Sequence, residues 1–339
     1  MAIRVGINGF GRIGRDMTRA AFNRSDNGEP GLEIVAINDV ADPATLANLL
    51  RHDSTYGPWQ VPVYTEEHTM SVDGQSILVT SERDPADLPW RELGVDLVLE
   101  STGKFRTRDA AAAHLAAGAR KVIITAPGKG VDATIVMGVN EDAYDPDTHH
   151  IVSNASCTTN CLAPMLWVLH NTFGVINGLV TTIHSYTGDQ NLLDGPHKDP
   201  RRARSAAVNL IPTSTGAAAA VGEVLPELAG RLDGIAVRVP VEDGSLTDLT
   251  VKVAATGVTP DQINRAFADA AGGHLKSVLR YTEDPIVSRD IIGDPASCVL
   301  DASLTRVEGD LVKVFGWYDN EWGYSNRTLD LAHLMARTM

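Results

Sequence analysis

Cysteine is scarce in this chain, with three residues in 339. Three thiols cannot all pair within one chain, which excludes a disulfide-stapled fold and points to a reducing compartment with cysteine available for thiol chemistry. Long hydrophobic runs are also missing, since none approaches the ~18 residues of a membrane-spanning helix. The sequence opens directly on a strand-like run, without the charged-then-apolar pattern of a secretory leader. We therefore expect a cytoplasmic protein.

Positive charge is in short supply: 29 Lys and Arg stand against 43 Asp and Glu, a net charge of −14. A surface this acidic repels nucleic acid and anionic membranes, so we expect neither as a partner, although a local basic pocket could hold a small anion. Hydrophobic residues make up 43% and charged residues 21%, which excludes a disordered chain or a fibre. At this length, two domains are expected.

The first half alternates short apolar runs with alanine-rich helical stretches, which is typical of βαβ units in a parallel sheet. The predicted strands lack polar alternation, as expected for a sheet covered on both faces. They are Ile3–Asn8, Leu32–Asn38, Val95–Glu100, Lys121–Thr125 and Thr134–Val139, with helices over Arg12–Arg24 and Asp109–Ala117.

The second half has Val- and Thr-rich strand patterns with fewer helices between them, which favours a mostly antiparallel sheet in an α+β domain. These strands are Leu179–Ile183, Ile235–Val239, Leu246–Ala254 and Leu311–Trp317. Residues 185–212 form a long connection, and such connections are usually functional or disordered. We place the first domain at 1–156 and the second at 157–320, with a C-terminal helix within 321–339 packing back on the first.

A dinucleotide site is predicted near the N-terminus. Gly9, Gly11 and Gly14 fit G-x-G-x-x-G between a strand and a helix, and Asp39 closes the next strand. Glycines let the backbone approach a pyrophosphate at the helix N-terminus, and the carboxylate would bind the ribose and repel a 2′-phosphate. The alternative is a glycine turn with a surface carboxylate. The context favours a Rossmann-type domain that binds NAD rather than NADP.

Cys157 is the candidate nucleophile. It lies in S-N-A-S-C-T-T-N-C, just before the apolar stretch Leu162–Leu169, so we expect it in the first turn of a helix capped by Ser156 or Ser153. There, the helix dipole and free N–H groups would lower the thiol pKa. The alternative is a small buried apolar residue, against which the polar neighbours argue.

His184 is the candidate base because it ends a predicted strand, where it can project toward a helix terminus. Taken alone, His184 would be interpreted as a structural histidine. Its pairing with a candidate nucleophilic thiol makes a catalytic base the favoured interpretation. Cys157 and Cys161 also form C-x-x-x-C. Because no further ligands accompany them, we expect no metal site.

Anion-binding groups gather in the second half. Thr213–Gly216 opens a predicted helix over Ala217–Leu228, and its hydroxyl and N–H groups suit a phosphate. Arg238 lies within an apolar strand, where a guanidinium needs a partner. The alternatives are a solvated basic surface or subunit contact for the long connection, and an internal ion pair for Arg238. The basic residues of the connection are Lys198, Arg201, Arg202 and Arg204.

Taken together, the chain resembles the phosphorylating, NAD-dependent glyceraldehyde-3-phosphate dehydrogenases from end to end. The motifs that carry the resemblance are N-G-F-G-R-I-G-R at 8–15, A-I-N-D at 36–39, E-S-T-G at 100–103, S-N-A-S-C-T-T-N-C at 153–161, H-S-Y-T at 184–187, R-R-A-R at 201–204, T-S-T-G-A-A at 213–218, R-V-P at 238–240 and Y-D-N-E-W-G-Y-S at 318–325.

The resemblance implies that glyceraldehyde 3-phosphate, NAD and inorganic phosphate react through a thiohemiacetal and a thioester of Cys157, with His184 as base. It implies substrate-phosphate contacts from Thr187, Asp189 and Arg238. For the attacking phosphate it implies Ser156, Thr158, Arg202, Thr215 and Gly216.

The resemblance also implies a homotetramer, with the long connection near neighbouring subunits. Asn320 would hold the nicotinamide amide. Further cofactor contacts implied, beside the three glycines, are Arg12, Ile13, Asp39, Arg83 and Thr125.

The sequence departs from the family pattern in two places. Ala219 stands where many relatives have lysine, which removes a positive charge near the phosphate helix, and Gly195 precedes Pro196 where some have leucine. Two alternatives remain open at this point: an erythrose-4-phosphate dehydrogenase and a non-catalytic NAD-binding interaction protein.

Overall fold

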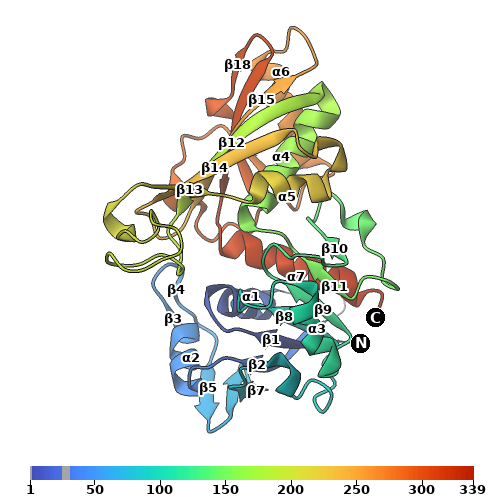
Figure 1. The fold of residues 1–339 in the computed structure, drawn as a ribbon, viewed down its shortest axis with the longest axis vertical. Coiled ribbons are helices and arrows are strands. Elements are labelled where there is room, and N and C mark those ends of the chain that lie inside the picture. Colours follow the sequence, from blue (N-terminus) through green and yellow to red (C-terminus); the bar gives the residue numbers. More distant parts are fainter. Residues whose placement is uncertain (1, 25–30) are drawn as a thin grey trace. The chain divides into compact units, whose positions relative to one another are not determined.

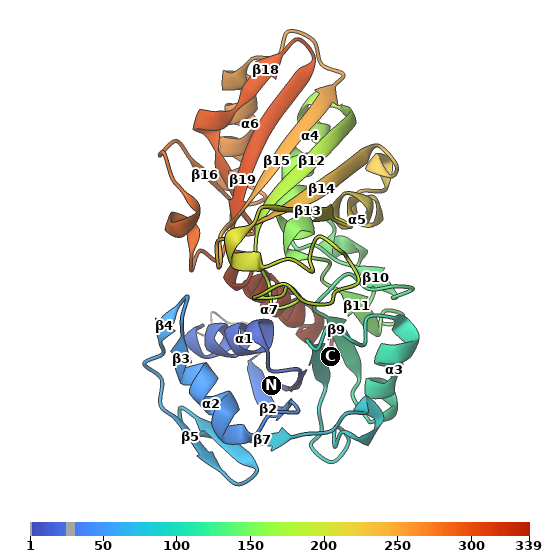
Figure 2. The same cartoon turned by 60° about the vertical axis from the view of Figure 1, so that its left-hand side comes forward.

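The computed structural model describes residues 2–24 and 31–339. The chain folds as two compact units, drawn in Figures 1 and 2. Unit 1 comprises residues 1–135, 141–155 and 325–339, and unit 2 comprises residues 136–140 and 156–324. The domain limits predicted from the sequence, at 156 and 320, remain a prediction.

Unit 1 is built on a mostly parallel sheet with the order β10-β11-β9-β8-β1-β2-β7-β6-β5. Only the pairs β5–β6 and β6–β7 are antiparallel among the described strands of this sheet. The strands are β1 (Ile3–Asn8), β2 (Leu32–Asn38), β5 (Val63–Glu66), β6 (Thr69–Val72), β7 (Gln75–Thr80), β8 (Leu97–Glu100), β9 (Lys121–Ile124), β10 (Ala133–Thr134) and β11 (Ile151–Ser153).

The centre of this sheet is apolar on both faces, because the helices that connect parallel strands cover both sides. Every residue of β8 and β9 is buried. The strand order reverses at β1, which has β2 on one side and β8 on the other. In open α/β sheets, ligands bind at the carboxyl ends of the strands around such a reversal.

Helices α1 (Arg12–Asn23), α2 (Pro43–Arg51) and α3 (Arg108–Ala116) follow β1, β2 and β8. Asp42 and Thr107 cap α2 and α3 with their side chains. Most of the C-terminal helix α7 (Trp322–Ala336) belongs to unit 1, where Arg24 donates to Asp330 at 2.8 Å and to Asn326 at 2.9 Å. A short hairpin, β3 (His52–Asp53) with β4 (Gly57–Pro58), follows α2.

The strand predicted over Thr134–Val139 is wrong. Only Ala133–Thr134 forms a strand, and the chain turns at Gly138, whose φ is +83°. Ile135 and Val136 are fully buried without being in a strand. The apolar run at 134–139 therefore reflects burial and not a strand. The left-handed conformation of Gly138 is incompatible with extended backbone.

Unit 2 contains a mostly antiparallel sheet with the order β13-β14-β12-β15-β19-β17-β16, and β18 pairs with β19. The pairs β12–β14 and β16–β17 are parallel. The strands are β12 (Val175–Ser185), β13 (Ile211–Ser214), β14 (Leu232–Val239), β15 (Ser245–Val253), β16 (Leu279–Thr282), β17 (Cys298–Asp301), β18 (Arg306–Glu308) and β19 (Leu311–Tyr318).

Helices α4 (Cys157–Phe173), α5 (Ala217–Val224) and α6 (Pro260–Gly272) pack against this sheet, as Figure 2 shows. The alternating burial along β15 fits a sheet with one covered face. The connection from β12 to β13 is long and mostly irregular. No helix among the described residues is long and apolar enough to cross a membrane.

Candidate active site

A cavity of about 250 Å³ opens at the carboxyl ends of β1, β2 and β8 in unit 1. Of the residues predicted to bind the cofactor, Gly9, Gly11, Asp39 and Arg83 line it. The residues that sequence reasoning missed share one signal, because each is the last residue of a strand of this sheet or lies shortly after one. They are Asn8, Asn38, Val40, Glu82, Ser101, Thr102, Lys104 and Phe105.

The three glycines of the motif have different surroundings. Gly9 has φ +95°, and a Cβ there would lie 2.6 Å from the backbone nitrogen of Thr102. A Cβ on Gly14 would lie 2.3 Å from the carbonyl oxygen of Gly9, whereas one on Gly11 would meet nothing within 4 Å. Gly9 and Gly14 thus allow close packing, and Gly11 leaves open space at the start of α1. A phosphate group fits such a helix start.

Asp39 lies just after β2 and accepts backbone hydrogen bonds with both carboxylate oxygens. Phe10 donates to Oδ2 at 2.8 Å, and Ala41 donates to Oδ1 at 3.1 Å. The carboxylate is therefore fixed beside the glycine turn and lines the cavity. A ribose hydroxyl could donate to it, and its negative charge would repel a phosphate ester.

The other predicted cofactor residues of unit 1 do not line this cavity. Arg12 forms an ion pair with Asp53, and its guanidinium lies 5.5 Å from the ring centroid of Tyr56. Ile13 is half-buried in the first turn of α1. Thr125 follows β9, and its hydroxyl donates to the carbonyl of Glu100 at 3.1 Å. Their contacts with a cofactor remain predictions.

Cys157 begins α4, and Ser156 is the N-cap residue, accepting a hydrogen bond from the Thr159 backbone at 3.0 Å. The predicted helix start is thereby confirmed. All three cysteines lie in the described residues and are free thiols: Cys157 is partly exposed, whereas Cys161 and Cys298 are buried.

The structure brings Cys157 and His184 together, with Sγ 3.5 Å from Nε2. His184 is buried near the end of β12, and its Nδ1 lies 2.7 Å from the carbonyl oxygen of Ser185. The carbonyl oxygen can only accept, and the two hydrogens of Arg238 Nη1, which lies 3.0 Å from Nδ1, are taken by the Ser185 carbonyl and the Thr187 hydroxyl. We therefore assign the ring proton to Nδ1. The lone pair of Nε2 then faces the thiol. This tautomer suits a base that removes the thiol proton.

The pKa values of this pair differ from the sequence-based expectation. Desolvation of the sulfur by the protein packed around it raises the pKa of Cys157 to about 11, although the residue is partly exposed and Arg238 opposes the rise. Burial, and then Arg238, lowers the pKa of His184 to about 3. The predicted lowering of the thiol pKa is wrong, because loss of hydration outweighs the helix dipole at this site. The resting pair is a neutral thiol beside a neutral imidazole.

Arg238 lies on β14 beside this pair. Its Nη1 donates to the Ser185 carbonyl at 3.0 Å and to the Thr187 hydroxyl at 3.2 Å, and lies 3.0 Å from Nδ1 of His184. In the part of the chain that the structure describes, Arg238 forms no ion pair within 4.0 Å, and its buried Nε has no partner. A buried guanidinium with an unused donor suits an anionic ligand.

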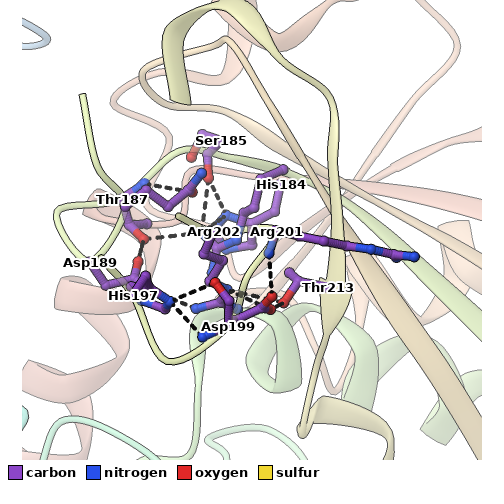
Figure 3. Close-up of polar contacts among 11 residues, drawn as sticks. His184, Ser185, Thr187, Asp189, His197, Asp199, Arg201, Arg202 and Thr213 are labelled. Atoms are coloured by element: carbon purple, nitrogen blue, oxygen red, sulfur yellow. Dashed lines mark hydrogen bonds and ion pairs between the residues drawn. The ribbon is translucent and has the colours of Figure 1, made fainter. Parts of the chain in front are cut away.

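A network of charged and hydroxyl groups lies along the long connection, as Figure 3 shows. Arg238 joins this network through the hydroxyl of Thr187. Thr187 donates to Asp189, whose other oxygen accepts from Arg202 at 2.5 Å. Arg202 also donates to Thr213 at 3.1 Å. The hydrogen bond from Thr187 and the charge of Arg202 hold the pKa of Asp189 below its usual value, against the effect of burial.

The remaining residues predicted around the phosphates are not hydrogen-bonded to this network. The Thr158 hydroxyl is buried against that of Tyr318 at 2.8 Å. Thr215 accepts from the Ala217 backbone at 3.2 Å, and Gly216 is the N-cap residue of α5. Their roles toward a phosphate, like that of Ser156, remain predictions.

Asn320 is buried in unit 2, with its side-chain oxygen held by two serines. Ser185 donates to Oδ1 at 2.8 Å and Ser245 donates to it at 2.7 Å. These two bonds orient the amide, so its Nδ2 is the group left to donate. An amide donor suits the carboxamide oxygen of a nicotinamide.

Tyr318 and Ser185 support the site, and sequence reasoning gave neither of them a role. The Tyr318 ring meets that of His184 edge-on with centroids 5.9 Å apart, and its hydroxyl bonds to Thr182 at 2.8 Å. Tyr318 could have been found through the motif at 318–325, which it begins. Within residues 2–24 and 31–339, no group of three or more His, Cys, Asp and Glu side chains is placed to hold a metal ion.

Two family models match long segments of this chain. The family model described as "Glyceraldehyde 3-phosphate dehydrogenase, NAD binding domain" matches residues 3–108, and the model of the C-terminal domain of the same enzyme matches residues 156–320. The chain belongs to the glyceraldehyde-3-phosphate dehydrogenase family.

Similar proteins named glyceraldehyde-3-phosphate dehydrogenase come from several bacteria. The Streptomyces coelicolor protein is 60% identical over 333 residues, covering 98% of each chain. The Geobacillus stearothermophilus protein is 54% identical over 337 residues, covering 99% of each. The Mycobacterium bovis protein is 54% identical over 341 residues, covering 100% of each. These matches do not favour an erythrose-4-phosphate dehydrogenase or a non-catalytic binding protein.

Proposed function

We propose that this member of the family oxidises D-glyceraldehyde 3-phosphate and joins it to inorganic phosphate, giving 1,3-bisphosphoglycerate in glycolysis and gluconeogenesis. The observation that carries the proposal is the Cys157 thiol, whose Sγ lies 3.5 Å from Nε2 of the buried His184 imidazole. Beside this pair, Arg238 has an unused donor for an anion.

Cys157 and His184 perform the covalent chemistry. Sγ attacks the aldehyde carbon while its proton passes to Nε2, and that proton then moves to the former carbonyl oxygen, giving a thiohemiacetal. During oxidation, the hydroxyl proton of this adduct returns to Nε2 and a thioester of Cys157 remains. Phosphate then attacks the thioester carbon, the C–S bond breaks, and the imidazolium returns its proton to the sulfur.

NAD, when bound, supplies the hydride acceptor for this oxidation. The cavity of unit 1 fits its adenosine and pyrophosphate, with open space at Gly11 and a fixed carboxylate at Asp39. Asn320 would hold the nicotinamide amide through Nδ2. Arg12, Ile13, Gly14, Arg83 and Thr125 complete the proposed cofactor contacts.

The two phosphates are proposed to bind the cationic network of unit 2. Arg238 and Thr187, which Asp189 orients, would hold the phosphate of the substrate. Arg202 would hold the attacking phosphate, with Ser156, Thr158, Thr215 and Gly216. Arg202 is supported for this role because Asp189 and Thr213 fix its guanidinium, and a guanidinium binds phosphate oxygens in pairs. Ala219 supplies no charge to this site.

The thioester tests this proposal. Mixing the protein with aldehyde and NAD in the absence of phosphate should leave a 3-phosphoglyceryl group on the Cys157 peptide in mass spectra of the acid-quenched protein. Adding phosphate should remove the group. The buried Cys161 and Cys298 are internal controls, and an acyl group on either of them would refute the assignment of the nucleophile.

We further propose that the chain forms a homotetramer. Exposed large apolar side chains gather on the long connection of unit 2, and Leu192 and Leu193 are exposed by 74% and 76%. Val208 and Leu210 are also exposed there, together with Leu179 on β12. Apolar groups of this size in water mark a protein interface, and a second copy of this chain is the partner proposed.

The cytoplasm is the proposed compartment. The reaction needs Cys157 as a free thiol, and each cysteine of the chain is free. A reducing compartment keeps thiols in that state.

A further inference from the structure

A buried polar network lies under the cavity of unit 1, centred on Glu100, the last residue of β8. Four donors among the described residues reach its carboxylate. Asn8 Nδ2 and His114 Nε2 donate to Oε2 at 2.6 Å and 3.0 Å, and the backbone and hydroxyl of Thr102 donate to Oε1. Both oxygens of Glu100 are therefore fully used as acceptors.

Trp90 sets the direction of this network. Its indole Nε1 lies 3.0 Å from Nδ1 of His114, and an indole N–H can only donate. Nδ1 of His114 is therefore an acceptor, and the ring proton is on Nε2, which faces Glu100. Trp90, His114 and Glu100 are all nearly or fully inaccessible to water, so the three form one buried, directed chain of hydrogen bonds.

The chain of bonds ends on residues that line the cavity, whereas Glu100 and His114 do not line it. Asn8, bound to Glu100, accepts from Asn38 at 2.7 Å, and Asn38 accepts from the Glu82 backbone at 2.8 Å. Through Asn8 and Thr102, the network ties together the carboxyl ends of β1, β2 and β8.

The backbone around the network leaves little room for adjustment. Ser101 donates from its backbone to the Asn8 carbonyl at 2.7 Å, and Gly9 donates to that of Asn38 at 2.8 Å. A Cβ on Gly9 would lie 2.6 Å from the Thr102 nitrogen. A shift of Thr102 or Asn8 would thus move the glycine turn as well.

We propose that Glu100 and His114 are positioning residues for dinucleotide binding, which act through Asn8 and Thr102. This inference rests on the proposed function, because it takes the cavity to hold the adenosine and pyrophosphate part of NAD. It also gives a role to E-S-T-G at 100–103, a motif that the covalent chemistry does not use.

Glu100→Gln tests the inference with a nearly isosteric change. The new amide must point its N–H groups either at the Thr102 donors or at those of Asn8 and His114, because Trp90 holds the tautomer. We expect the KM for NAD and the Kd for ADP-ribose to rise about tenfold. The kcat at saturating NAD and the KM for the aldehyde should stay within about twofold.

Two further variants separate positioning from simple loss of stability. Met70→Ala opens a cavity on β6, where Met70 is fully buried, and should lower the melting temperature without changing the KM for NAD. Trp90→Phe keeps a ring but removes the donor that fixes the tautomer, so it should raise the KM for NAD about threefold, even if Glu100→Gln does not fold.

The inference is overturned if folded Glu100→Gln and Trp90→Phe bind ADP-ribose as the wild type does. It is also overturned if Met70→Ala and Glu100→Gln raise the KM for NAD to the same extent. A wild-type protein that binds neither NAD nor ADP-ribose would refute the proposed function itself, and the inference with it.

Discussion

Cys157 and His184 are both neutral in the resting protein, and this neutrality shapes how each can act. A thiol whose pKa is raised to about 11 is a poor nucleophile by itself. An imidazole whose pKa is lowered to about 3 is unprotonated at neutral pH and free to accept the thiol proton. The proton therefore moves within the pair as the sulfur attacks, and neither group acts without the other.

Replacing His184 with Asn removes the proton acceptor but leaves the cavity of unit 1 unchanged. We expect kcat to fall by roughly 10²–10⁴, the usual contribution of a positioned base, while the Kd for NAD stays within about twofold. Rapid-mixing measurement of the acylation step checks this prediction. An unchanged acylation rate at neutral pH would show that another group takes the proton.

The lowered pKa of His184 also predicts how stability depends on pH. Below about pH 6.5 the unfolded chain takes up a proton at this residue, whereas the folded chain does so only near pH 3. The free energy of unfolding should therefore decrease as pH falls through this range, with a contribution from His184 of about 1.4 kcal/mol per pH unit.

Urea unfolding at fixed protein concentration, repeated from pH 7 to pH 4, measures that slope. His184→Asn should remove the contribution, and His68→Asn, at a highly exposed side chain, serves as the control. If His184→Asn and wild type show the same slope, the imidazole is not held neutral in the folded state.

Among the elements, those with local signals were predictable from the sequence. The strand over Ile3–Asn8 was predicted with the bounds that the structure has. The sequence also predicted Cys157 in the first turn of a helix, with Ser156 as one of two candidate caps, and the structure has Ser156 as the N-cap. Both signals are local features of the sequence. The strands β5, β6 and β7 have no comparable signal in the sequence. Their residues are partly exposed, so the apolar runs that mark buried strands are missing.

In the candidate site, too, the features with local sequence signals were predictable and those that depend on tertiary packing were not. The motifs at 153–161 and 184–187 pointed to Cys157 and His184, whose contact at 3.5 Å the structure then provides. The direction in which the pKa of the Cys157 thiol shifts could not be predicted, because it depends on the tertiary packing that removes water from the sulfur. The network of Glu100 and His114 was hidden for the same reason, since its members are far apart in the sequence.

The turn after β2 holds Asp39, which we expect to determine the choice between NAD and NADP. Asp39→Asn keeps an acceptor for the Phe10 or Ala41 backbone but removes the charge. Since a 2′-phosphate would no longer meet a carboxylate, we expect the ratio of kcat/KM for NADP to that for NAD to rise at least about tenfold.

Steady-state kinetics with both cofactors measure this ratio. Asp42→Asn is the matched control. Asp42 lies three residues after Asp39, caps helix α2 and does not line the cavity. A ratio in Asp39→Asn equal to that of wild type would show that Asp39 does not face the ribose.

For the whole molecule, the exposed leucines of the long connection predict assembly. Leu193→Asp places a charge in the proposed interface, where desolvating it is costly. Light scattering should give four times the chain mass for the wild type and a smaller mass for this variant. Tyr64→Asp, at an exposed aromatic on β5 of unit 1, should leave the mass unchanged. Equal masses for Leu193→Asp and wild type would place the subunit contacts elsewhere.

The central proposal for the whole molecule is that Cys157 holds an acyl group that phosphate removes. The most direct measurement is formation of NADH, followed by its absorbance, with aldehyde and NAD and with or without phosphate. We expect a burst of about one NADH per chain without phosphate, continuous turnover when phosphate is added, and neither in Cys157→Ser. Continuous turnover that does not depend on phosphate, or any turnover in Cys157→Ser, would contradict the account.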